Sequence, residues 1–168
     1  MSELRLGALS RDDRQELAAL LTATSAFSAD EIAVALELFD DGMVSSADYE
    51  LLGAFGVSDE LLGYACFGAT PMTDGAWDLY WLAVHPGTQR RGVGRALLSR
   101  VEDLLAARGA RLLLVETSSR ESYMHTRQFY DRAGYSESAR IADFYAPADD
   151  RIILTSRLFP QERGVITR

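Results

Sequence analysis

The spacing of apolar positions along the chain predicts a regular succession of strands and helices. Alternating or short unbroken apolar runs are typical of strands, whereas apolar residues three to four apart are typical of helices. Strands are predicted at residues 3–8, 49–56, 60–69, 77–84, 111–117, 135–143 and 151–157, and helices at 10–22, 28–42, 92–108 and 122–133. The predicted order is β-α-α-β-β-β-α-β-α-β-β, an α/β (α+β) arrangement.

The predicted strand at 77–84 belongs in the centre of a sheet. Both of its alternating sets of side chains are largely apolar, which is typical of strands covered on two sides. The helix at 92–108 leads from it to the strand at 111–117, and the right-handed crossover rule makes these two strands a parallel pair. The segments 49–56 and 60–69, joined by a short turn, form an antiparallel hairpin. The sheet is therefore expected to be mixed.

The loop at residues 84–96, VHPGTQRRGVGRA, is the most informative motif in the chain. Gly92 and Gly94 have no side chain, so backbone amides there can close on phosphate oxygens at the positive end of a helix dipole. Arg91 and Arg95 are four residues apart and add cations on one helical face. The alternative is that the glycines merely begin a helix beneath solvated arginines. That alternative explains less, because a strand, a loop and a helix stand here in the order that phosphate binding requires.

Spacing excludes two familiar phosphate loops. A P-loop needs Gly-Lys-Ser/Thr, and the dinucleotide fingerprint needs a small residue where this chain has Leu97. The chain instead meets the pattern Gln/Arg-x-x-Gly-x-Gly/Ala with Gln89, Gly92 and Gly94. This pattern resembles the acetyl-CoA loop of the GCN5-related N-acetyltransferase (GNAT) superfamily.

The resemblance covers residues 60–145. Residues 82–86 (LAVHP) are similar to the family's preceding strand end, and residues 129–135 (FYDRAGY) are similar to its Phe-Tyr-x-x-x-Gly-Phe/Tyr signature. The resemblance implies the GNAT fold, a mixed, mostly antiparallel central sheet of about six or seven strands with a splayed parallel pair, flanked by about four helices. We therefore expect a single domain at 1–168, with its core at about 3–158 and a C-terminal tail at 159–168.

The resemblance also implies acetyl-CoA as the acetyl-donor cosubstrate. The backbone of residues 82–84 would bond the pantetheine amides as an added strand does, with an N–H near Leu82 facing the developing oxyanion. The loop at 89–95 would hold the pyrophosphate. The residues expected to bind the cofactor are Leu82, Ala83, Val84, Gln89, Arg90, Arg91, Gly92, Val93, Gly94, Arg95, Tyr123 and Arg127.

Direct transfer needs an acid for the coenzyme A thiolate and a base for the attacking ammonium. Tyr130 occupies the tyrosine of the family's Phe-Tyr signature, and the resemblance makes it the general acid, with an ordinary phenol pKa near 10. Asp78 and Glu116 are the candidate bases, since each is a lone carboxylate inside an otherwise apolar strand. Alternatively, these carboxylates pair with arginines or bind the substrate amine. The sequence leaves open which of the two is the base.

Composition narrows the function classes. The chain has 168 residues, of which 48% are hydrophobic and 25% charged, and this suits one globular domain. Its net charge of -8 argues against nucleic-acid binding. No metal is expected, because His85 and His125 have no partner at ligand spacing. With Cys66 as the single cysteine, no secretory signal at the start and no apolar run near the ~18 residues of a membrane helix, a cytoplasmic protein away from membranes is expected.

The predicted function is acetyl-CoA-dependent N-acetyl transfer to a primary amine of a small molecule, peptide or protein. The alternative is a non-catalytic acyl-CoA-binding sensor or assembly module of the same fold. The acceptor, the acyl-chain length and the oligomeric state stay open, and a homodimer is compatible with the family. Aromatic side chains are candidates for lining the acceptor pocket: Phe27, Tyr49, Trp81, Phe144 and Tyr145.

Overall fold

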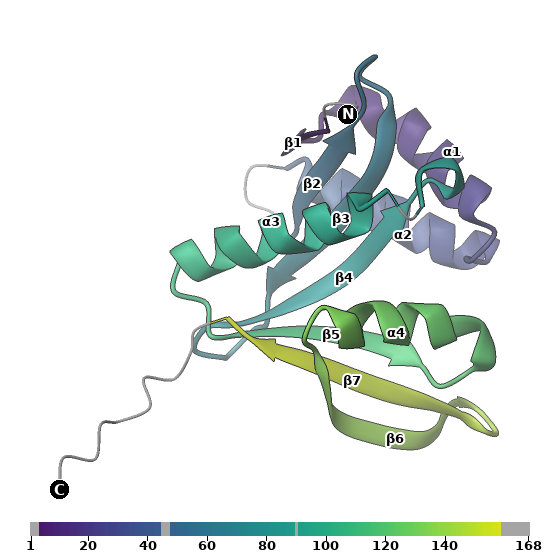
Figure 1. The fold of residues 1–168 in the computed structure, drawn as a ribbon, viewed down its shortest axis with the longest axis vertical. Helices are drawn as coiled ribbons and strands as arrows, with labels where there is room; N and C mark the ends of the chain where they lie inside the picture. The colour runs from purple at the N-terminus through teal and green to yellow at the C-terminus, as the bar shows by residue number, and fades with distance from the viewer. Residues whose placement is uncertain (1–3, 45–47, 90, 159–168) are drawn as a thin grey trace, which may run out of the picture. The chain divides into compact units, whose positions relative to one another are not determined.

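The computed structural model describes residues 4–44, 48–89 and 91–158 (Figure 1). The strands are β1 (Arg5–Ala8), β2 (Glu50–Phe55), β3 (Leu61–Ala69), β4 (Ala76–Val84), β5 (Leu112–Ser118), β6 (Ser136–Ala146) and β7 (Asp149–Arg157). The α-helices are α1 (Arg14–Thr24), α2 (Ala29–Gly42), α3 (Val93–Ala107) and α4 (Met124–Arg132). Short 3-10 helices are η1 (Arg11–Asp13), η2 (Pro86–Thr88) and η3 (Glu121–Tyr123). The order of strands and helices predicted from the sequence is confirmed.

The strands follow the order β1-β2-β3-β4-β5-β7-β6 in one sheet. β4 and β5 form the parallel pair and the sheet is otherwise mostly antiparallel, which confirms the predicted fold class. The C-terminal hairpin is longer than predicted, because β6 continues to Ala146 and β7 begins at Asp149. Its tight turn is held by Asp143, whose Oδ1 accepts a hydrogen bond of 2.6 Å from the Ala148 N–H. Both residues of this bond have positive φ, 52° and 62°.

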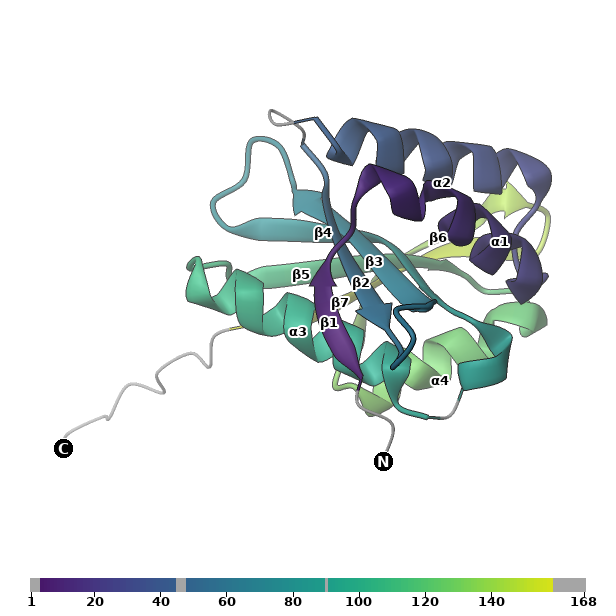
Figure 2. The same cartoon turned by 90° about the horizontal axis from the view of Figure 1, so that it is seen from above.

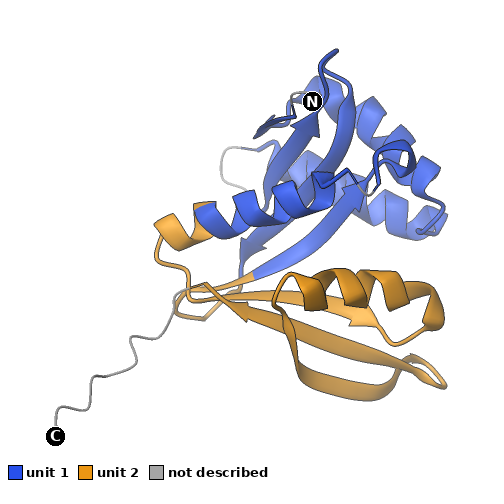
Figure 3. Ribbon diagram, viewed as in Figure 1, with its two compact units in different colours: residues 1–69, 78–103 blue, residues 70–77, 104–168 orange. Residues whose placement is uncertain are grey.

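The chain divides into two compact units, which Figure 3 colours separately. The first unit consists of residues 1–69 and 78–103. Within it, α1 and α2 lie together on one face of the strands (Figure 2). The buried side chains of this face come from both helices, from β2, β3 and β4, and from the residue that follows β1: Leu9, Leu17, Leu20, Leu21, Ala35, Phe39, Phe55, Leu61, Tyr64, Cys66 and Ala83.

α3 covers the opposite face of this first unit. Successive residues of a strand point to opposite faces. Tyr64 of β3 packs in the core under α1 and α2, and its neighbour Gly63 has Val93 and Leu97 of α3 beside it. Val93 and Leu97 are buried. The apolar stripe predicted for this helix therefore faces the strands.

A capping box and a closely packed glycine mark the two ends of α2. At the start, the Glu31 N–H donates to Ser28 Oγ at 3.2 Å and the Ser28 N–H donates to Glu31 Oε2 at 2.7 Å. The helix ends at Gly42, the predicted helix end, and Met43 follows at a right-handed φ of -82°. A Cβ on Gly42 would lie 2.9 Å from the Leu51 side chain. Close packing against β2, not a left-handed turn, therefore accounts for this glycine.

The second unit consists of residues 70–77 and 104–168, described here to residue 158. β7 pairs antiparallel with both β5 and β6. α4 precedes β6 and ends before Gly134, which has a φ of 91° and whose N–H donates to the Asp131 carbonyl at 3.0 Å. A left-handed glycine just after the last turn is a common C-terminal signal of helices, and it directly follows the helix that the sequence predicts at 122–133.

A buried carboxylate organises the segment after β5. Asp149 is 3% exposed; its Oδ1 accepts a short hydrogen bond from the Ser118 hydroxyl, and its Oδ2 lies 2.8 Å from Arg120 Nε. The Arg120 N–H donates in turn to Ser118 Oγ at 3.0 Å. These contacts fix the chain between β5 and η3 against the start of β7.

We expect Asp149→Ala to lower the free energy of unfolding by about 2 kcal/mol, because Ser118 and Arg120 lose their buried acceptor. Urea denaturation followed by circular dichroism measures this. The matched control is Asp131→Ala, an exposed aspartate of α4, for which the change should stay within about 0.5 kcal/mol. Equal unfolding midpoints for the two variants would contradict the role given to Asp149.

Candidate cofactor loop and catalytic residues

The candidate cofactor loop begins where β4 ends. The His85 N–H donates to the Leu62 carbonyl of β3 at 2.8 Å, and the His85 ring accepts a hydrogen bond of 3.1 Å from the Gly87 N–H at Nδ1. The Thr88 N–H donates to the His85 carbonyl at 2.9 Å. His85 thus turns the chain out of the strand, as the sequence predicted for a loop residue at this exit.

The start of α3 offers an open set of backbone donors. Gly92 has a φ of 80°, and a Cβ placed on it would meet no atom within 4 Å. Among the described residues, the first hydrogen bond into the helix runs from the Ala96 N–H to the Gly92 carbonyl at 2.9 Å. The N–H groups of Val93, Gly94 and Arg95 precede that bond, so they are the donors that a helix N-terminus leaves without an intrahelical acceptor. Together with the helix dipole they favour an anion at this point.

The predicted loop residues divide into inward and outward ones. The side chains of Gln89, Arg91 and Arg95 are exposed, whereas Val93 is buried. Val93 can therefore contribute only its backbone to a bound phosphate. Arg90, also predicted to contact the cofactor, lies outside the described residues.

The strand that precedes the loop supplies the second predicted set of cofactor contacts. Leu82 and Val84 are half-buried and Ala83 is buried in the core under α1 and α2. Backbone groups at the end of such a strand can pair with an extended amide chain as a neighbouring strand would.

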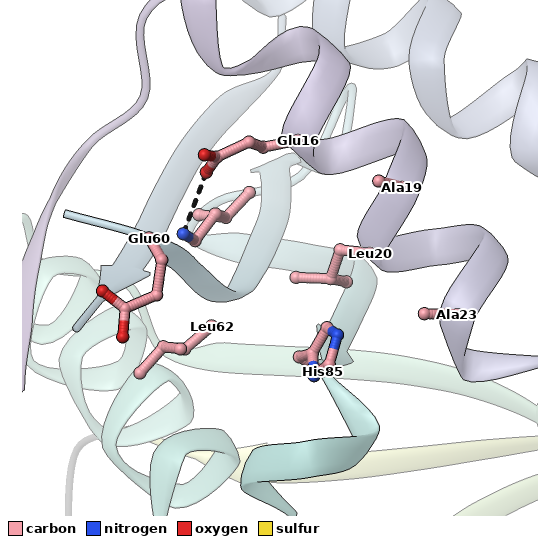
Figure 4. A pocket seen from close by; sticks show the side chains of 8 residues that line it. Glu16, Ala19, Leu20, Ala23, Glu60, Leu62 and His85 are labelled. Atoms are coloured by element: carbon pink, nitrogen blue, oxygen red, sulfur yellow. Dashed lines mark hydrogen bonds between the residues drawn. The ribbon is translucent and has the colours of Figure 1, made fainter. Parts of the chain in front are cut away.

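A groove of about 430 Å³ adjoins the loop within the first unit (Figure 4). Glu16, the start of β3 and His85 border it, and Glu16 Oε2 accepts a hydrogen bond of 3.0 Å from the Leu61 N–H. The residues that line this groove were not predicted from the sequence. One charged residue beside an apolar stripe is ordinary in an amphipathic helix, so nothing in the helical pattern distinguishes Glu16.

Tyr130, the predicted acid, is a buried residue of α4 in the second unit. It is 4% exposed, and its ring makes edge-to-face contacts with Phe129 at 5.1 Å and Tyr135 at 5.3 Å between ring centroids. Burial raises the pKa of Tyr130 above its ordinary value. The phenol therefore keeps its proton at neutral pH, as a general acid must.

Glu116, one of the two candidate bases, forms an ion pair with Arg151 of β7. The Arg151 guanidinium also lies over the Phe144 ring, 4.9 Å from its centroid. The pKa of Tyr145 is raised, first by burial and then by the charge of Glu116. The alternative that a strand carboxylate pairs with an arginine is thus confirmed for Glu116.

Asp78, the other candidate base, is half-buried on β4 in the first unit. Tyr80 lies two residues further along the strand and makes an edge-to-face contact with Tyr49 at 5.3 Å. The pKa of Tyr80 is raised, first by burial and then by the charge of Asp78. The Asp78 carboxylate therefore lies near the Tyr80 phenol, and the Tyr80 ring packs in turn against Tyr49.

Tyr123 and Arg127 were predicted to bind the cofactor. Tyr123 is the last residue of η3, immediately before α4. Arg127 Nη1 donates to the carbonyls of Ser118 and Arg120, at 2.7 Å and 2.8 Å. The structure thus gives Arg127 a part in holding the segment after β5, and the cofactor contacts of Tyr123 and Arg127 stay predictions.

The aromatic candidates for the acceptor pocket fall into a buried group and an exposed group. Phe27 and Trp81 make an edge-to-face contact at 5.0 Å and, like Tyr49, pack against the core under α1 and α2. Phe144 and Tyr145 are exposed on β6.

In the described part of the chain, no helix is long and apolar enough to cross a bilayer, and no three His, Cys, Asp or Glu side chains are grouped to hold a metal ion.

Comparisons with known proteins agree with this architecture. Residues 48–137 match the family model described as acetyltransferase (GNAT) domain. The chain belongs to the GNAT family. A crystal structure of a putative GNAT acetyltransferase from Desulfovibrio desulfuricans is 38% identical, with a TM-score of 0.87 over 95% of this chain and 100% of that one. The family recognised from the sequence is therefore confirmed.

Two further similar proteins carry named activities. The [ribosomal protein bS18]-alanine N-acetyltransferase of Escherichia coli (strain K12) is 33% identical over 87 residues, which span 52% of this chain and 57% of that protein. This chain thus spans little more than half the length of that curated relative. An aminoglycoside 6′-N-acetyltransferase solved in complex with coenzyme A has a TM-score of 0.71 at 18% identity, covering 94% of this chain and 98% of that one. The latter likeness shows the fold alone.

Proposed function

We propose that this GNAT protein is an acetyl-CoA-dependent N-acetyltransferase that transfers the acetyl group directly to a primary amine. The observation that carries the proposal is the start of α3, where the N–H groups of residues 93–95 stand at the positive end of a helix beside an open glycine. Exposed Arg91 and Arg95 add positive charge there. This is the chemistry that a pyrophosphate needs.

We assign the pantetheine arm to the end of β4. Backbone groups of Leu82, Ala83 and Val84 would pair with its amides, and an N–H near Leu82 would donate to the oxyanion that forms on the thioester carbonyl. Removal of one such donor costs roughly 2.7 to 4 kcal/mol of transition-state stabilisation in comparable acyl transfers. The complex of one structural neighbour with coenzyme A supports a coenzyme A ligand for this fold.

Direct transfer without an acyl-enzyme is supported by the state of the single cysteine. Cys66 is 1% exposed in the core, and burial raises the pKa of its thiol to about 12. A covalent route would need a thiolate near neutral pH. The amine nitrogen therefore attacks the thioester carbon itself, a C–N bond forms, and the C–S bond breaks.

Protons move at three points in this reaction. Asp78 or Glu116 takes one from the ammonium before attack, and Tyr130 gives its proton to the departing thiolate. The nitrogen loses its second proton once the C–N bond has formed, and that proton restores the Tyr130 phenol. Glu116 is paired with Arg151, and the roles of base and of binding group for the acceptor amine stay open for both carboxylates. Comparing Glu116→Gln with Asp78→Asn, each as a pH profile of kcat/KM, distinguishes the base from the binding group.

The second candidate function is an acyl-CoA-binding module without turnover. The buried, protonated Tyr130 and the carboxylates inside strands favour the enzyme, since a sensor needs neither. The names of the relatives state N-acetyl transfer to a ribosomal-protein alanine and to an aminoglycoside. They support a primary amine on a peptide or a small molecule as the acceptor.

The test is the release of coenzyme A from acetyl-CoA in the presence of amines, amino acids and peptides, against a control without acceptor. We expect acceptor-dependent release, and the acceptor that gives it names the substrate class. Calorimetry with acetyl-CoA is run in parallel. Binding without any release would favour the sensor, and absence of binding would overturn the cofactor assignment.

A further inference from the structure

Two consecutive residues of β3 hold both ends of the candidate cofactor loop. The Leu62 carbonyl accepts the His85 N–H at 2.8 Å, immediately after β4. Gly63 lies against the Ala83 carbonyl of β4 and against Val93 and Leu97 of α3. The strand end that enters the loop and the helix that leaves it therefore meet at one point of β3.

A side chain at Gly63 has no room. An ideal Cβ there would lie 2.9 Å from the Ala83 carbonyl oxygen, 3.1 Å from Leu97 Cδ1 and 3.3 Å from Val93 Cγ1, where carbon contacts are normally about 3.5 to 4.0 Å. The carbonyl oxygen belongs to the backbone and cannot rotate away. Leu97 and Val93 are 0% and 4% exposed, so neither can move into solvent.

Glycine is otherwise a poor choice inside a strand. It weakens the strand through its backbone entropy and offers no side chain to pack, and it often marks a place where another backbone approaches closely. β3 continues past this point with buried residues on both faces. The close approach of β4 and α3 is therefore the physical reason for glycine at this position.

We propose that Gly63 is a positioning residue for the cofactor. A methyl group at this position would separate the end of β4 from the first turn of α3, which carry the backbone groups at 82–84 and the N–H groups at 93–95. These are the two sets of backbone groups to which the proposed function assigns pantetheine and pyrophosphate, so the inference rests on that function. Gly63 itself touches no part of the cofactor in this scheme.

The test is Gly63→Ala in the full chain, with acetyl-CoA as the probe. We expect the dissociation constant from calorimetry and the KM for acetyl-CoA to rise about tenfold. The added methyl group displaces the backbone groups that bind the cofactor, and binding must bring them back against this overpacking. At saturating acetyl-CoA, kcat should fall by a smaller factor than KM rises, because the side chains that move protons are unchanged and only the oxyanion donor near Leu82 shifts with the end of β4.

The matched control is Gly53→Ala on β2. Its Cβ would lie 2.7 Å from the Phe55 ring and 2.9 Å from the Leu9 side chain, so the nearest atoms that it would overpack belong to neither β4 nor α3. Thermal unfolding is recorded for both variants. We expect Gly53→Ala to lose stability and to keep wild-type affinity for acetyl-CoA.

A second variant covers the case in which Gly63→Ala does not fold. Gly63→Ala combined with Leu97→Ala removes the 3.1 Å contact and keeps the contact with the Ala83 carbonyl. It should bind acetyl-CoA more weakly than Leu97→Ala alone. Wild-type affinity in a folded Gly63→Ala protein, or an equal loss in Gly53→Ala, would overturn the inference. Failure of the wild-type protein to bind acetyl-CoA would instead overturn the proposed function.

Discussion

Gly92→Glu should weaken acetyl-CoA binding by about 100-fold, from two separate causes. A side chain at a φ of 80° costs roughly 1 to 2 kcal/mol of backbone strain. The new carboxylate would also stand where the helix dipole and the N–H groups of residues 93–95 favour an anion, and it would repel the pyrophosphate. A 100-fold loss corresponds to about 2.7 kcal/mol. Calorimetry with acetyl-CoA measures it.

Gly109 supplies the matched control for Gly92. It follows α3 with a φ of 83°, and a Cβ placed on it would also meet no atom within 4 Å. Gly109→Glu therefore carries the same strain and the same charge at the other end of the helix. We expect it to keep acetyl-CoA affinity within about twofold, while Gly92→Ala, which adds strain without charge, should fall between the two. Equal affinities for Gly92→Glu and Gly109→Glu would refute the placement of the pyrophosphate.

The order of elements could be predicted because the signals that carry it are local. Apolar periods, the Ser28 capping box and the glycine after α4 each act over a few residues. The apolar faces of 77–84 were enough to place that strand at the centre of the sheet. The reason for glycine at position 42 was not predictable, because it is the Leu51 side chain, nine residues away in sequence.

The candidate site was predictable only where its chemistry is contiguous in the chain. The loop at 84–96 presents its glycines and arginines side by side, so the spacing alone predicts an anion site. The Arg151 partner of Glu116 lies 35 residues further on. No local sequence pattern predicts such an ion pair. The two residues meet only because β5 and β7 pair in an antiparallel register.

The close packing of Gly63 against neighbouring backbone could not be predicted from the sequence either. In the sequence, Gly63 is one more glycine in an apolar run, and its contact with Ala83 and α3 appears only when β3 and β4 are paired. The Asp149 network likewise joins residues 31 positions apart. Sequence patterns thus identify ligand-binding residues more readily than the residues that hold the ligand-binding residues in position.

Tyr130→Phe should lower kcat by about 100-fold, the size of effect expected when a general acid is lost. The phenol is buried, and burial raises the pKa of Tyr130, so the wild-type residue stays protonated well above neutral pH. Phenylalanine retains the ring contacts with Phe129 and Tyr135 but has no proton to give to the thiolate. The dissociation constant for acetyl-CoA should remain within about twofold, since the loop is untouched.

Tyr135→Phe is the control that separates acid catalysis from packing. Tyr135 is 4% exposed like Tyr130, and their rings make an edge-to-face contact at 5.3 Å. The family signature accepts Phe or Tyr at the position of Tyr135, so kcat should be nearly unchanged there. A thiol with a lower pKa as leaving group should also restore part of the rate in Tyr130→Phe, because its thiolate departs without protonation. Equal kcat values for the two variants would remove Tyr130 from the mechanism and leave it as a core residue of α4.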